Sequence, residues 1–149
     1  MENPTSEIII EQIRPEHTWA LRRDVLYPGM MKHEMEMEED ANGMHFGAYT
    51  NNKLVGVISL FHSGTDYQFR KLAIAHDHQR KGIGNLLLNQ VARQAEEEGG
   101  TRIWCNARVD AIGFYLKAGY YQTGKPFTKN NIDYEIMEKA ITPASDRTE

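Results

Sequence analysis

The sequence predicts one domain of mixed α/β class over residues 1–149, and three features of its pattern support that prediction. The first half contains short β-prone segments separated by turn residues, which is typical of strands. Two amphipathic segments, beginning near residues 83 and 111, each follow a strand and have helical spacing. The length suits one such domain. Strands followed by two strand–helix alternations favour a layered α/β architecture.

The amino-terminal part is predicted to form a strand, a helix and a loop. Residues 7–13 are rich in isoleucine and predict the strand. Pro15 suits the first turn of a helix, which the turn residues 27–29 end. The apolar residues of that helix recur at near-helical spacing: Trp19, Leu21, Val25 and Leu26. Residues 30–43 lack a clear period, so we expect a mobile helix or loop there.

Three consecutive strands are expected between residues 44 and 74. Residues 44–49 and 54–60 read as the first two, and Asn51-Asn52 lies between them. Asparagine tolerates the left-handed backbone that tight hairpin turns require, so this pair predicts a hairpin. Residues 68–74 form the third strand and lead into a turn that contains glycine.

A long amphipathic helix is predicted directly after that turn. Its apolar positions form one stripe: Ile83, Leu86, Leu87, Leu88, Val91, Ala92 and Ala95. The intervening residues are polar or charged and are expected to face water. Gly99-Gly100 ends the helix, because glycine readily adopts the conformation found after helix ends.

A further strand and a short helix follow. Residues 102–105 form the strand, and Asp110 has the side chain of a helix N-cap. The residues expected on the buried side of this helix are Ile112, Tyr115 and Leu116. Gly119 ends the helix.

The chain closes with a pair of strands and a polar tail. Residues 121–127 and 133–138 are the expected strands, and Asn130-Asn131 lies in the turn between them. Residues 142–149 are polar, so we expect a disordered tail.

The turn at residues 79–84 has the composition of an anion site. Its sequence, Gln-Arg-Lys-Gly-Ile-Gly, opens a helix whose first N–H groups lack intrahelical partners and carry the positive end of the helix dipole. Gly82 and Gly84 lack Cβ atoms, so a phosphate can approach the peptide nitrogens, and Arg80 and Lys81 add positive charge. An ordinary strand-to-helix turn would also use such glycines. Neither a P-loop nor a dinucleotide fingerprint is indicated, because Gly-Lys-Ser/Thr and a third glycine are missing.

A second motif gives the turn a family context. Phe114-Tyr115 precedes Gly119-Tyr120 at the end of the short helix. Together the two motifs resemble the GNAT superfamily of acetyl-CoA-dependent N-acetyltransferases, whose members carry a Gln/Arg-x-x-Gly-x-Gly/Ala turn and a later Phe-Tyr-x-x-x-Gly-Phe/Tyr helix end. The resemblance spans residues 44–140 well and the preceding residues more loosely. It implies a GNAT-like, twisted, mostly antiparallel central sheet with splayed fourth and fifth strands, flanked by helices.

The resemblance also implies where acetyl-CoA binds. The diphosphate would meet the backbone N–H groups of residues 79–84, and the pantetheine arm would pair with the strand before the turn, where a main-chain N–H would polarise the thioester carbonyl. The residues assigned to the cofactor are Leu72, Ala73, Ile74, Gln79, Arg80, Lys81, Gly82, Ile83, Gly84, Asn85 and Asn106.

Tyr115 matches the family tyrosine that protonates the leaving thiolate. An ordinary tyrosine pKa of about 10 keeps the hydroxyl protonated at neutral pH, so it can donate without first taking up a proton. The alternative is that Phe114-Tyr115 is only a packed aromatic pair.

No general base and no metal site are assigned. The candidate bases are Glu34, Glu36, His45, His62, His76 and His78, and the spacing fixes none of them against an amine. His76-Asp77-His78 could supply two metal ligands, but further partners are not apparent, so we expect no metal.

Acidic residues gather in one short stretch: Glu34, Glu36, Glu38, Glu39 and Asp40. The ordinary interpretation is a solvated face or a mobile loop. The alternative is a negatively charged wall that attracts a cationic amine.

Composition argues against several classes of function. The net charge of −4 gives no basic footprint for nucleic acid. No apolar run suits a bilayer span, so no membrane partner is expected, and residues 1–7 lack the pattern of a signal peptide. The single cysteine, Cys105, is expected to be a buried apolar residue and fits a reducing compartment. We therefore expect a cytoplasmic protein.

These observations predict an N-acetyltransferase that moves an acetyl group from acetyl-CoA to a primary amine by direct attack. The acceptor would be a small molecule or a protein amine. One alternative is a non-catalytic acyl-CoA-binding or regulatory module. Another is a nucleotide-binding protein that uses the glycine turn for ATP phosphates, but a magnesium partner is not evident. Small family members often dimerise, so a homodimer is a further expectation.

Overall fold

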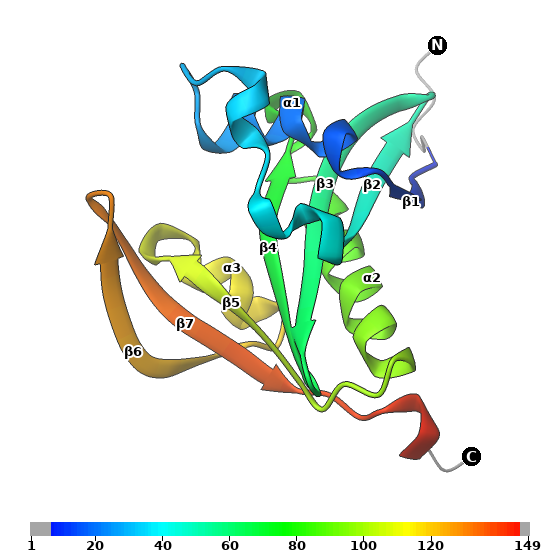
Figure 1. The fold of residues 1–149 in the computed structure, drawn as a ribbon, viewed down its shortest axis with the longest axis vertical. Helices are drawn as coiled ribbons and strands as arrows, with labels where there is room; N and C mark the ends of the chain where they lie inside the picture. Colours follow the sequence, from blue (N-terminus) through cyan, green and yellow to red (C-terminus); the bar gives the residue numbers. More distant parts are fainter. Residues whose placement is uncertain (1–6, 147–149) are drawn as a thin grey trace. The chain divides into compact units, whose positions relative to one another are not determined.

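The computed structural model describes residues 7–146, and residues 1–6 and 147–149 lie outside this description. Figure 1 shows the chain as a ribbon coloured along the sequence. The chain divides into two compact units. The first consists of Met1–Phe61 and Lys71–Gln90, and the second of His62–Arg70 and Val91–Glu149. The expectation of one domain stays a prediction, and the expectations for the signal-peptide region and the end of the tail fall largely outside the described residues.

Three antiparallel strands form the base of the first unit. The strands are β1 (Ile9–Ile13), β2 (Met44–Thr50) and β3 (Lys53–Ser63). β1 pairs with β2, and β2 pairs with β3. Asn51 and Asn52 connect β2 to β3 with φ angles of 51° and 62°, which confirms the predicted hairpin.

The chain between β1 and β2 is helical in its first part and consists of short turns in its second part. The helical part contains a 3-10 turn (Pro15–Thr18), α1 (Trp19–Leu21) and a π-helical turn (Arg22–Leu26). Two further 3-10 turns follow, at Lys32–Met35 and Glu38–Asn42. The helix prediction is confirmed, but its most buried residues are Thr18 and Arg22 rather than the apolar ones. The stretch predicted to be mobile has ordered turns and buries Met35 and Asp40.

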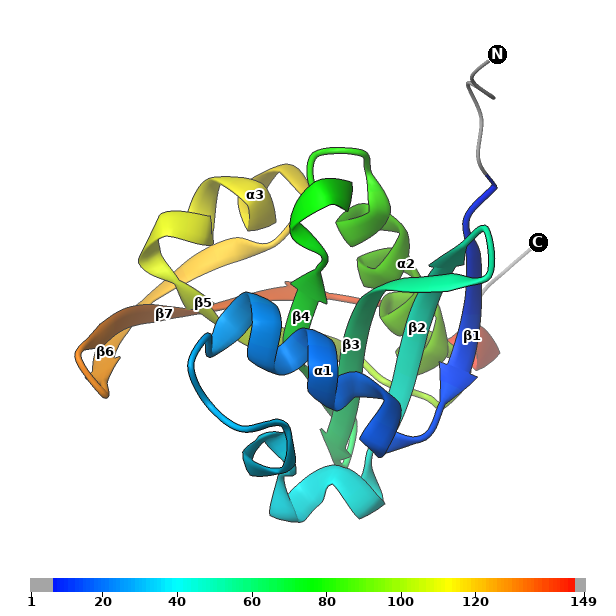
Figure 2. The ribbon, with the colours of Figure 1, turned by 90° about the horizontal axis from the view of Figure 1, so that it is seen from above.

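Helices cover both faces of the strands of the first unit. The helical segment at residues 15–26 crosses one face of β2 and β3, as Figure 2 shows. The first part of α2 (Ile83–Glu97) packs on the other face. A Cβ atom on Gly56 would lie only 2.8 Å from Ile74 Cδ1 and 3.1 Å from Leu87 Cδ1, so the missing side chain allows this close packing.

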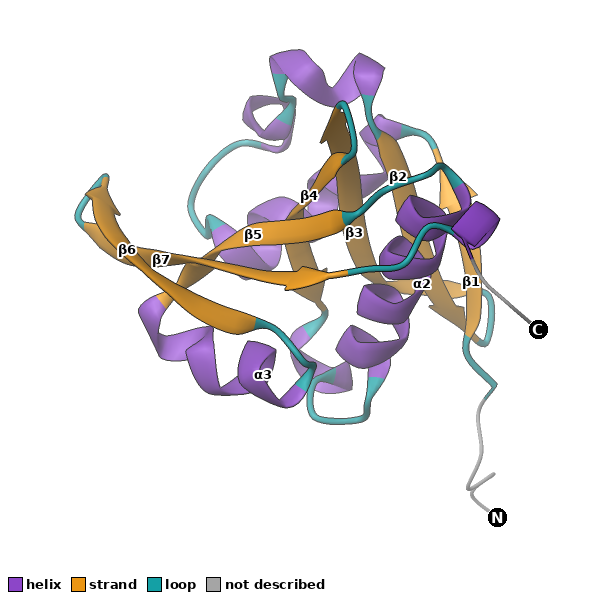
Figure 3. Cartoon of the chain, turned by 90° about the horizontal axis from the view of Figure 1, so that it is seen from below, coloured by secondary structure: helices purple, strands orange, loops and turns teal. Residues whose placement is uncertain are grey.

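The second unit contains the other end of the sheet. Its elements are the start of β4 (Asp66–Ile74), β5 (Arg102–Arg108), α3 (Ile112–Lys117), β6 (Tyr121–Lys129) and β7 (Ile132–Ala140). β7 lies between β5 and β6 and is antiparallel to both (Figure 3). β4 and β5 are parallel and share three residue pairs, Asp66–Arg102, Tyr67–Ile103 and Gln68–Trp104. This short pairing at the beginnings of both strands agrees with the divergence expected farther along.

The short helix differs from its prediction at both ends. Asp110 is not an N-cap, because it lies inside a 3-10 turn (Val109–Ala111) and α3 begins only at Ile112. Leu116 is 47% exposed instead of buried. Gly119, with φ of 94°, ends the helix as predicted.

The strand order is β1-β2-β3-β4-β5-β7-β6 in a seven-stranded, mostly antiparallel sheet, which confirms the predicted mixed α/β class. Asn130 and Asn131 form the turn of the closing strand pair with φ of 53° and 62°. Beyond β7, residues Ala144–Asp146 form a 3-10 turn. Disorder of the tail stays a prediction.

Candidate active site

The glycine turn lies between β4 and α2 in the first unit. The Gln79 side-chain amide donates to the carbonyl of Ile74 at 2.9 Å and so ties the turn to the end of the strand. Arg80 and Gly82 have left-handed backbones, with φ of 63° and 83°. No heavy atom would lie within 4 Å of a Cβ added to Gly82. The turn is therefore open at the place where a phosphate would approach.

The start of α2 combines one buried anchor with exposed polar neighbours. Ile83 is 2% exposed, whereas Arg80, Lys81 and Asn85 are exposed. Gly82 accepts the amide of Leu86 at 3.2 Å, so the N–H groups of the residues between them have no intrahelical acceptor. Such an end favours an anion.

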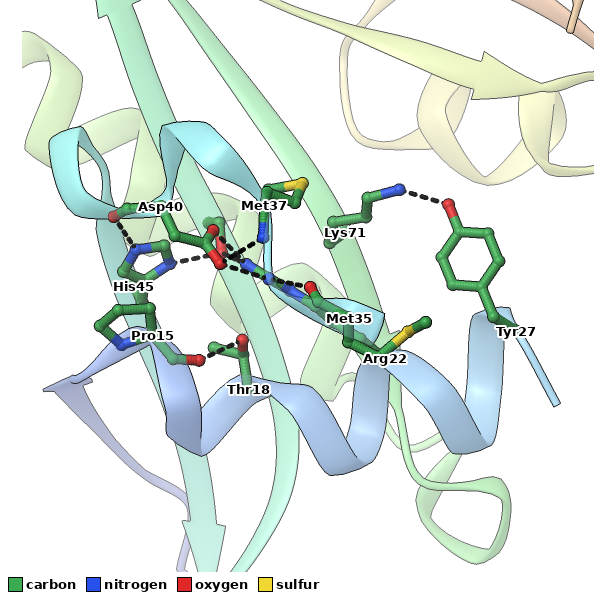
Figure 4. Close-up of polar contacts among 10 residues, drawn as sticks. Pro15, Thr18, Arg22, Tyr27, Met35, Met37, Asp40, His45 and Lys71 are labelled. Atoms are coloured by element: carbon green, nitrogen blue, oxygen red, sulfur yellow. Dashed lines mark hydrogen bonds and ion pairs between the residues drawn. The ribbon is translucent and has the colours of Figure 1, made fainter. Parts of the chain in front are cut away.

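Within β4, the residue before the segment expected to meet the pantetheine arm has an unusual backbone. Lys71 has φ of 59°, which is rare for a residue other than glycine and costs about 1–3 kcal/mol where it persists. Its ammonium donates to the Tyr27 hydroxyl and lies 4.6 Å from the centre of that ring (Figure 4). After Lys71, Ala73 is buried, and Leu72 and Ile74 are half-buried. The sequence pattern gave no signal for the Lys71–Tyr27 contact, because the two residues are far apart in the chain.

Tyr115 belongs to an aromatic cluster in the second unit. Its ring centre lies 5.7 Å from that of Phe69, 5.1 Å from that of Phe114 and 6.2 Å from that of Tyr120. Burial raises the pKa of Tyr115 well above its ordinary value, and the nearby Cys105 adds to this effect. The hydroxyl therefore keeps its proton over the whole neutral range.

Two neighbours of Tyr115 are buried without an evident chemical role. Cys105 is 2% exposed, and burial raises the pKa of its thiol to about 12, so it is not a nucleophile at neutral pH. Tyr120 is 2% exposed, and its hydroxyl has no hydrogen-bond partner among the residues that the structure describes.

Asn106 lies on β5, where it pairs with Ile136 of β7. Its side chain is exposed, while those of Cys105 and Ala107 are buried. Because side chains alternate along a strand, Asn106 faces away from the side that holds Cys105. Its contact with the cofactor stays a prediction.

The candidate bases have different environments. His45 is buried with both ring nitrogens in hydrogen bonds, whereas His62 stacks on Tyr67 at 5.0 Å. His76 Nε2 lies 3.3 Å from the Asp24 carbonyl, and His78 Nδ1 lies 2.9 Å from Asp77. Within residues 7–146, no three side chains of the metal-binding types come together.

The acidic stretch divides into exposed and buried residues. Glu34, Glu36 and Glu38 are exposed. Asp40 is 4% exposed and forms an ion pair with Arg22 at 2.9 Å, so it does not belong to a solvated face. Burial alone would raise the pKa of Asp40, but hydrogen bonds from Arg22 and from the Met37 amide hold it below its ordinary value.

An open depression of about 380 Å³ lies in the second unit. It is lined by Arg108, Val109, Asp110, Asn131, Ile132 and Asp133. The turn of the closing strand pair thus forms one wall of a recess that carries charges of both signs.

The comparisons with known proteins give acetyltransferases, which agrees with the fold and the glycine turn described above. A family model described as an acetyltransferase (GNAT) domain matches residues 9–141. An uncharacterised N-acetyltransferase of Bacillus subtilis, YitI, is 27% identical over 137 residues, which cover 86% of this chain and 92% of that protein.

Solved structures share the fold. An aminoglycoside 6′-N-acetyltransferase complexed with coenzyme A superposes with a TM-score of 0.77 at 18% identity, covering 95% of this chain and 99% of the other. A GNAT family acetyltransferase from Elizabethkingia anophelis with acetyl-CoA bound gives a TM-score of 0.72 at 18% identity, with 90% and 98% covered.

Proposed function

Because the chain belongs to the GNAT acetyltransferase family and is thus an N-acetyltransferase, we propose that it transfers an acetyl group from acetyl-CoA to a primary amine by direct attack. The observation that carries the proposal is the open glycine turn at the start of α2. Two solved relatives of the same fold are complexed with coenzyme A or acetyl-CoA, which supports the choice of co-substrate.

The turn residues fit the diphosphate of acetyl-CoA. A Cβ atom at position 82 would fill the space that the open turn leaves, and φ of 83° there disfavours any side chain. The peptide N–H groups at the start of α2 would donate to phosphate oxygens, and the exposed Arg80 and Lys81 would add positive charge. Leu72, Ala73 and Ile74 would pair with the pantetheine arm, and Asn85 and Asn106 would contact the cofactor.

Tyr115 would supply the proton in the reaction. Acetyl-CoA supplies a thioester, whose carbon–sulfur bond breaks as the amine nitrogen forms a bond to the carbonyl carbon. The protonated Tyr115 hydroxyl would donate its proton to the departing sulfur, and the proton that the nitrogen loses on becoming an amide would restore the phenol. Burial keeps the phenol protonated at neutral pH before the reaction.

The acceptor would be a small molecule or a protein amine that carries positive charge before deprotonation. The exposed carboxylates of Glu34, Glu36 and Glu38 would attract such a group. None of the candidate bases is assigned to deprotonate it.

The test combines binding and turnover. Thermal unfolding is followed with and without acetyl-CoA, because a ligand that binds only the folded state raises its stability. A panel of small amines and peptides is then screened by detection of free thiol. We expect a rise in melting temperature and thiol release with at least one amine. Binding without any release would instead indicate the acyl-CoA-binding module, and an absence of binding would refute the proposal.

Two further parts of the proposal concern the location of the protein in the cell and its oligomeric state. We propose a cytoplasmic location and a homodimer. The single cysteine, which is buried and unpaired, fits a reducing compartment. No helix within the described residues has the length and apolar character of a membrane span. Cell fractionation and light scattering of the purified protein test the two statements.

A further inference from the structure

A buried polar network holds residues 31–43 against the rest of the first unit (Figure 4). Arg22 is 1% exposed and donates two parallel hydrogen bonds to the Asp40 carboxylate, at 2.9 and 3.0 Å. It also donates to the Met35 carbonyl at 3.0 Å and to the Ser59 hydroxyl at 2.9 Å. The Asp40 carboxylate in turn accepts the Met37 amide at 3.0 Å. One guanidinium therefore contacts both 3-10 turns of the stretch.

Chemistry fixes the donor and acceptor roles of Arg22 and of the backbone carbonyl in this network. Arginine only donates, so the Ser59 oxygen accepts from Arg22, and the same oxygen is hydrogen-bonded to His45 Nδ1, 2.7 Å away. A backbone carbonyl only accepts, so His45 Nε2 carries a proton and donates it to the Asp40 carbonyl at 2.8 Å. The chain of hydrogen bonds thus runs from Arg22 through Ser59 and His45 back to Asp40.

The network joins four parts of the chain that sequence does not bring together. Arg22 comes from the π-helical turn, Asp40 from the second 3-10 turn, His45 from β2 and Ser59 from β3. Asp40, His45 and Ser59 are at most 4% exposed. Because a buried charge without its partner is costly, the Arg22–Asp40 pair strongly favours this one arrangement over an open one.

We propose that this network fixes residues 31–43 as a preformed wall of the acceptor site, with Arg22, Asp40, His45 and Ser59 as positioning residues. The inference rests on the proposed function. Its physical content is that the exposed carboxylates of Glu34, Glu36 and Glu38 are held in place before any amine binds. The free energy of amine binding is then not reduced by the entropy cost of ordering this stretch.

The test measures amide hydrogen exchange of the full chain by mass spectrometry, in wild type and in Asp40→Asn. This change removes the counter-charge of Arg22 but keeps the shape of the side chain. We expect exchange in residues 31–43 to rise by about tenfold or more, while α2 and β5 change by less than about twofold. Equal acceleration in all segments, or none in residues 31–43, would overturn the inference.

Two further variants make the test specific. Glu36→Gln is the matched control, since it makes the same acid-to-amide change at an exposed position in the same stretch, and it should leave exchange unaltered. Ser59→Ala removes one acceptor of Arg22 and the hydrogen-bond partner of His45 Nδ1. It is expected to accelerate exchange in residues 31–43 by about threefold, and it decides the question if Asp40→Asn does not fold.

Kinetics distinguish positioning from simple stabilisation. With an amine that is acetylated in the panel, Asp40→Asn should raise KM for the amine and leave KM for acetyl-CoA unchanged. An unaltered KM for the amine, despite faster exchange, would refute the positioning role. If wild type neither binds acetyl-CoA nor releases thiol, the proposed function fails, whereas the exchange data still decide whether the network fixes residues 31–43.

Discussion

The two units bury polar groups in different ways. In the first unit, the terminal nitrogens of Arg22 make four hydrogen bonds, and within this guanidinium only Nε has no partner among the described residues. In the second unit, the aromatic cluster buries phenol groups, and the Tyr120 hydroxyl has no partner among the described residues. Buried groups that hold one another serve position, while a phenol kept protonated by burial is available for proton transfer.

The largest effect is expected from Tyr115→Phe, which tests the chemical side of this contrast. Loss of a general acid should lower turnover by about a hundredfold or more, with KM for acetyl-CoA little changed. Steady-state kinetics with thiol detection measure both quantities. Because burial raises the pKa of Tyr115, wild-type activity should not fall on account of this group as pH rises toward 10. Unchanged turnover would remove Tyr115 from the mechanism.

The next effect concerns the structural side, and Arg22→Met tests it. The variant leaves the Asp40 carboxylate buried without a partner, so the free energy of unfolding should fall by about 3–5 kcal/mol. Urea denaturation measures it. Arg14→Met is the control, because Arg14 is 75% exposed and its pair with Glu16 should contribute less than about 1 kcal/mol.

The same variant has a characteristic pH dependence. The pKa of Asp40 is lowered in the folded protein, so its contribution to stability is present above the ordinary aspartate value and is lost as pH falls below it. Without Arg22 the buried carboxylate prefers to be protonated. The stability difference between wild type and Arg22→Met should therefore shrink between pH 7 and pH 3, roughly the range around the ordinary aspartate pKa. A constant difference would contradict the assigned ion pair.

A smaller effect is expected from Gly82→Ala, which tests the open turn. The left-handed backbone should cost about 1 kcal/mol of stability with any Cβ, and the dissociation constant of acetyl-CoA should rise by about tenfold. Gly99→Ala is a close match, because Gly99 has φ of 93° and equally open surroundings. It should show the stability loss alone. Equal cofactor affinity in both variants would exclude the turn as the diphosphate site.

The smallest effect is expected from Tyr120→Phe, which sharpens the comparison between two neighbouring tyrosines. Removing a buried hydroxyl without a partner should leave turnover unchanged and raise the free energy of unfolding by about 1 kcal/mol. Thermal denaturation and the thiol assay measure the two. A loss of activity similar to that of Tyr115→Phe would show that the two phenols act together.

Much of the fold could be predicted because its signals are local. Asn51-Asn52 and Asn130-Asn131 take the left-handed backbone that their sequence favours. The stripe of α2 has a period that a helix alone satisfies. The predicted start of α3 is wrong. Asp110 has a side chain that often caps helices, but the chain first makes a 3-10 turn there. Leu116 fits a helical stripe, yet nothing in its neighbourhood of the sequence shows that it stays exposed.

The same distinction between local signals and tertiary packing applies to the candidate site. The glycine turn and Tyr115 could be found in the sequence, since spacing within a few residues decides backbone conformation and motif identity. The roles of Arg22, Asp40 and His45 could not be found in the sequence. In the sequence, Asp40 is one of several clustered acidic residues and His45 one of several candidate bases, and nothing indicates that either contacts Arg22. Only tertiary packing decides which charges lose their water and must be paired.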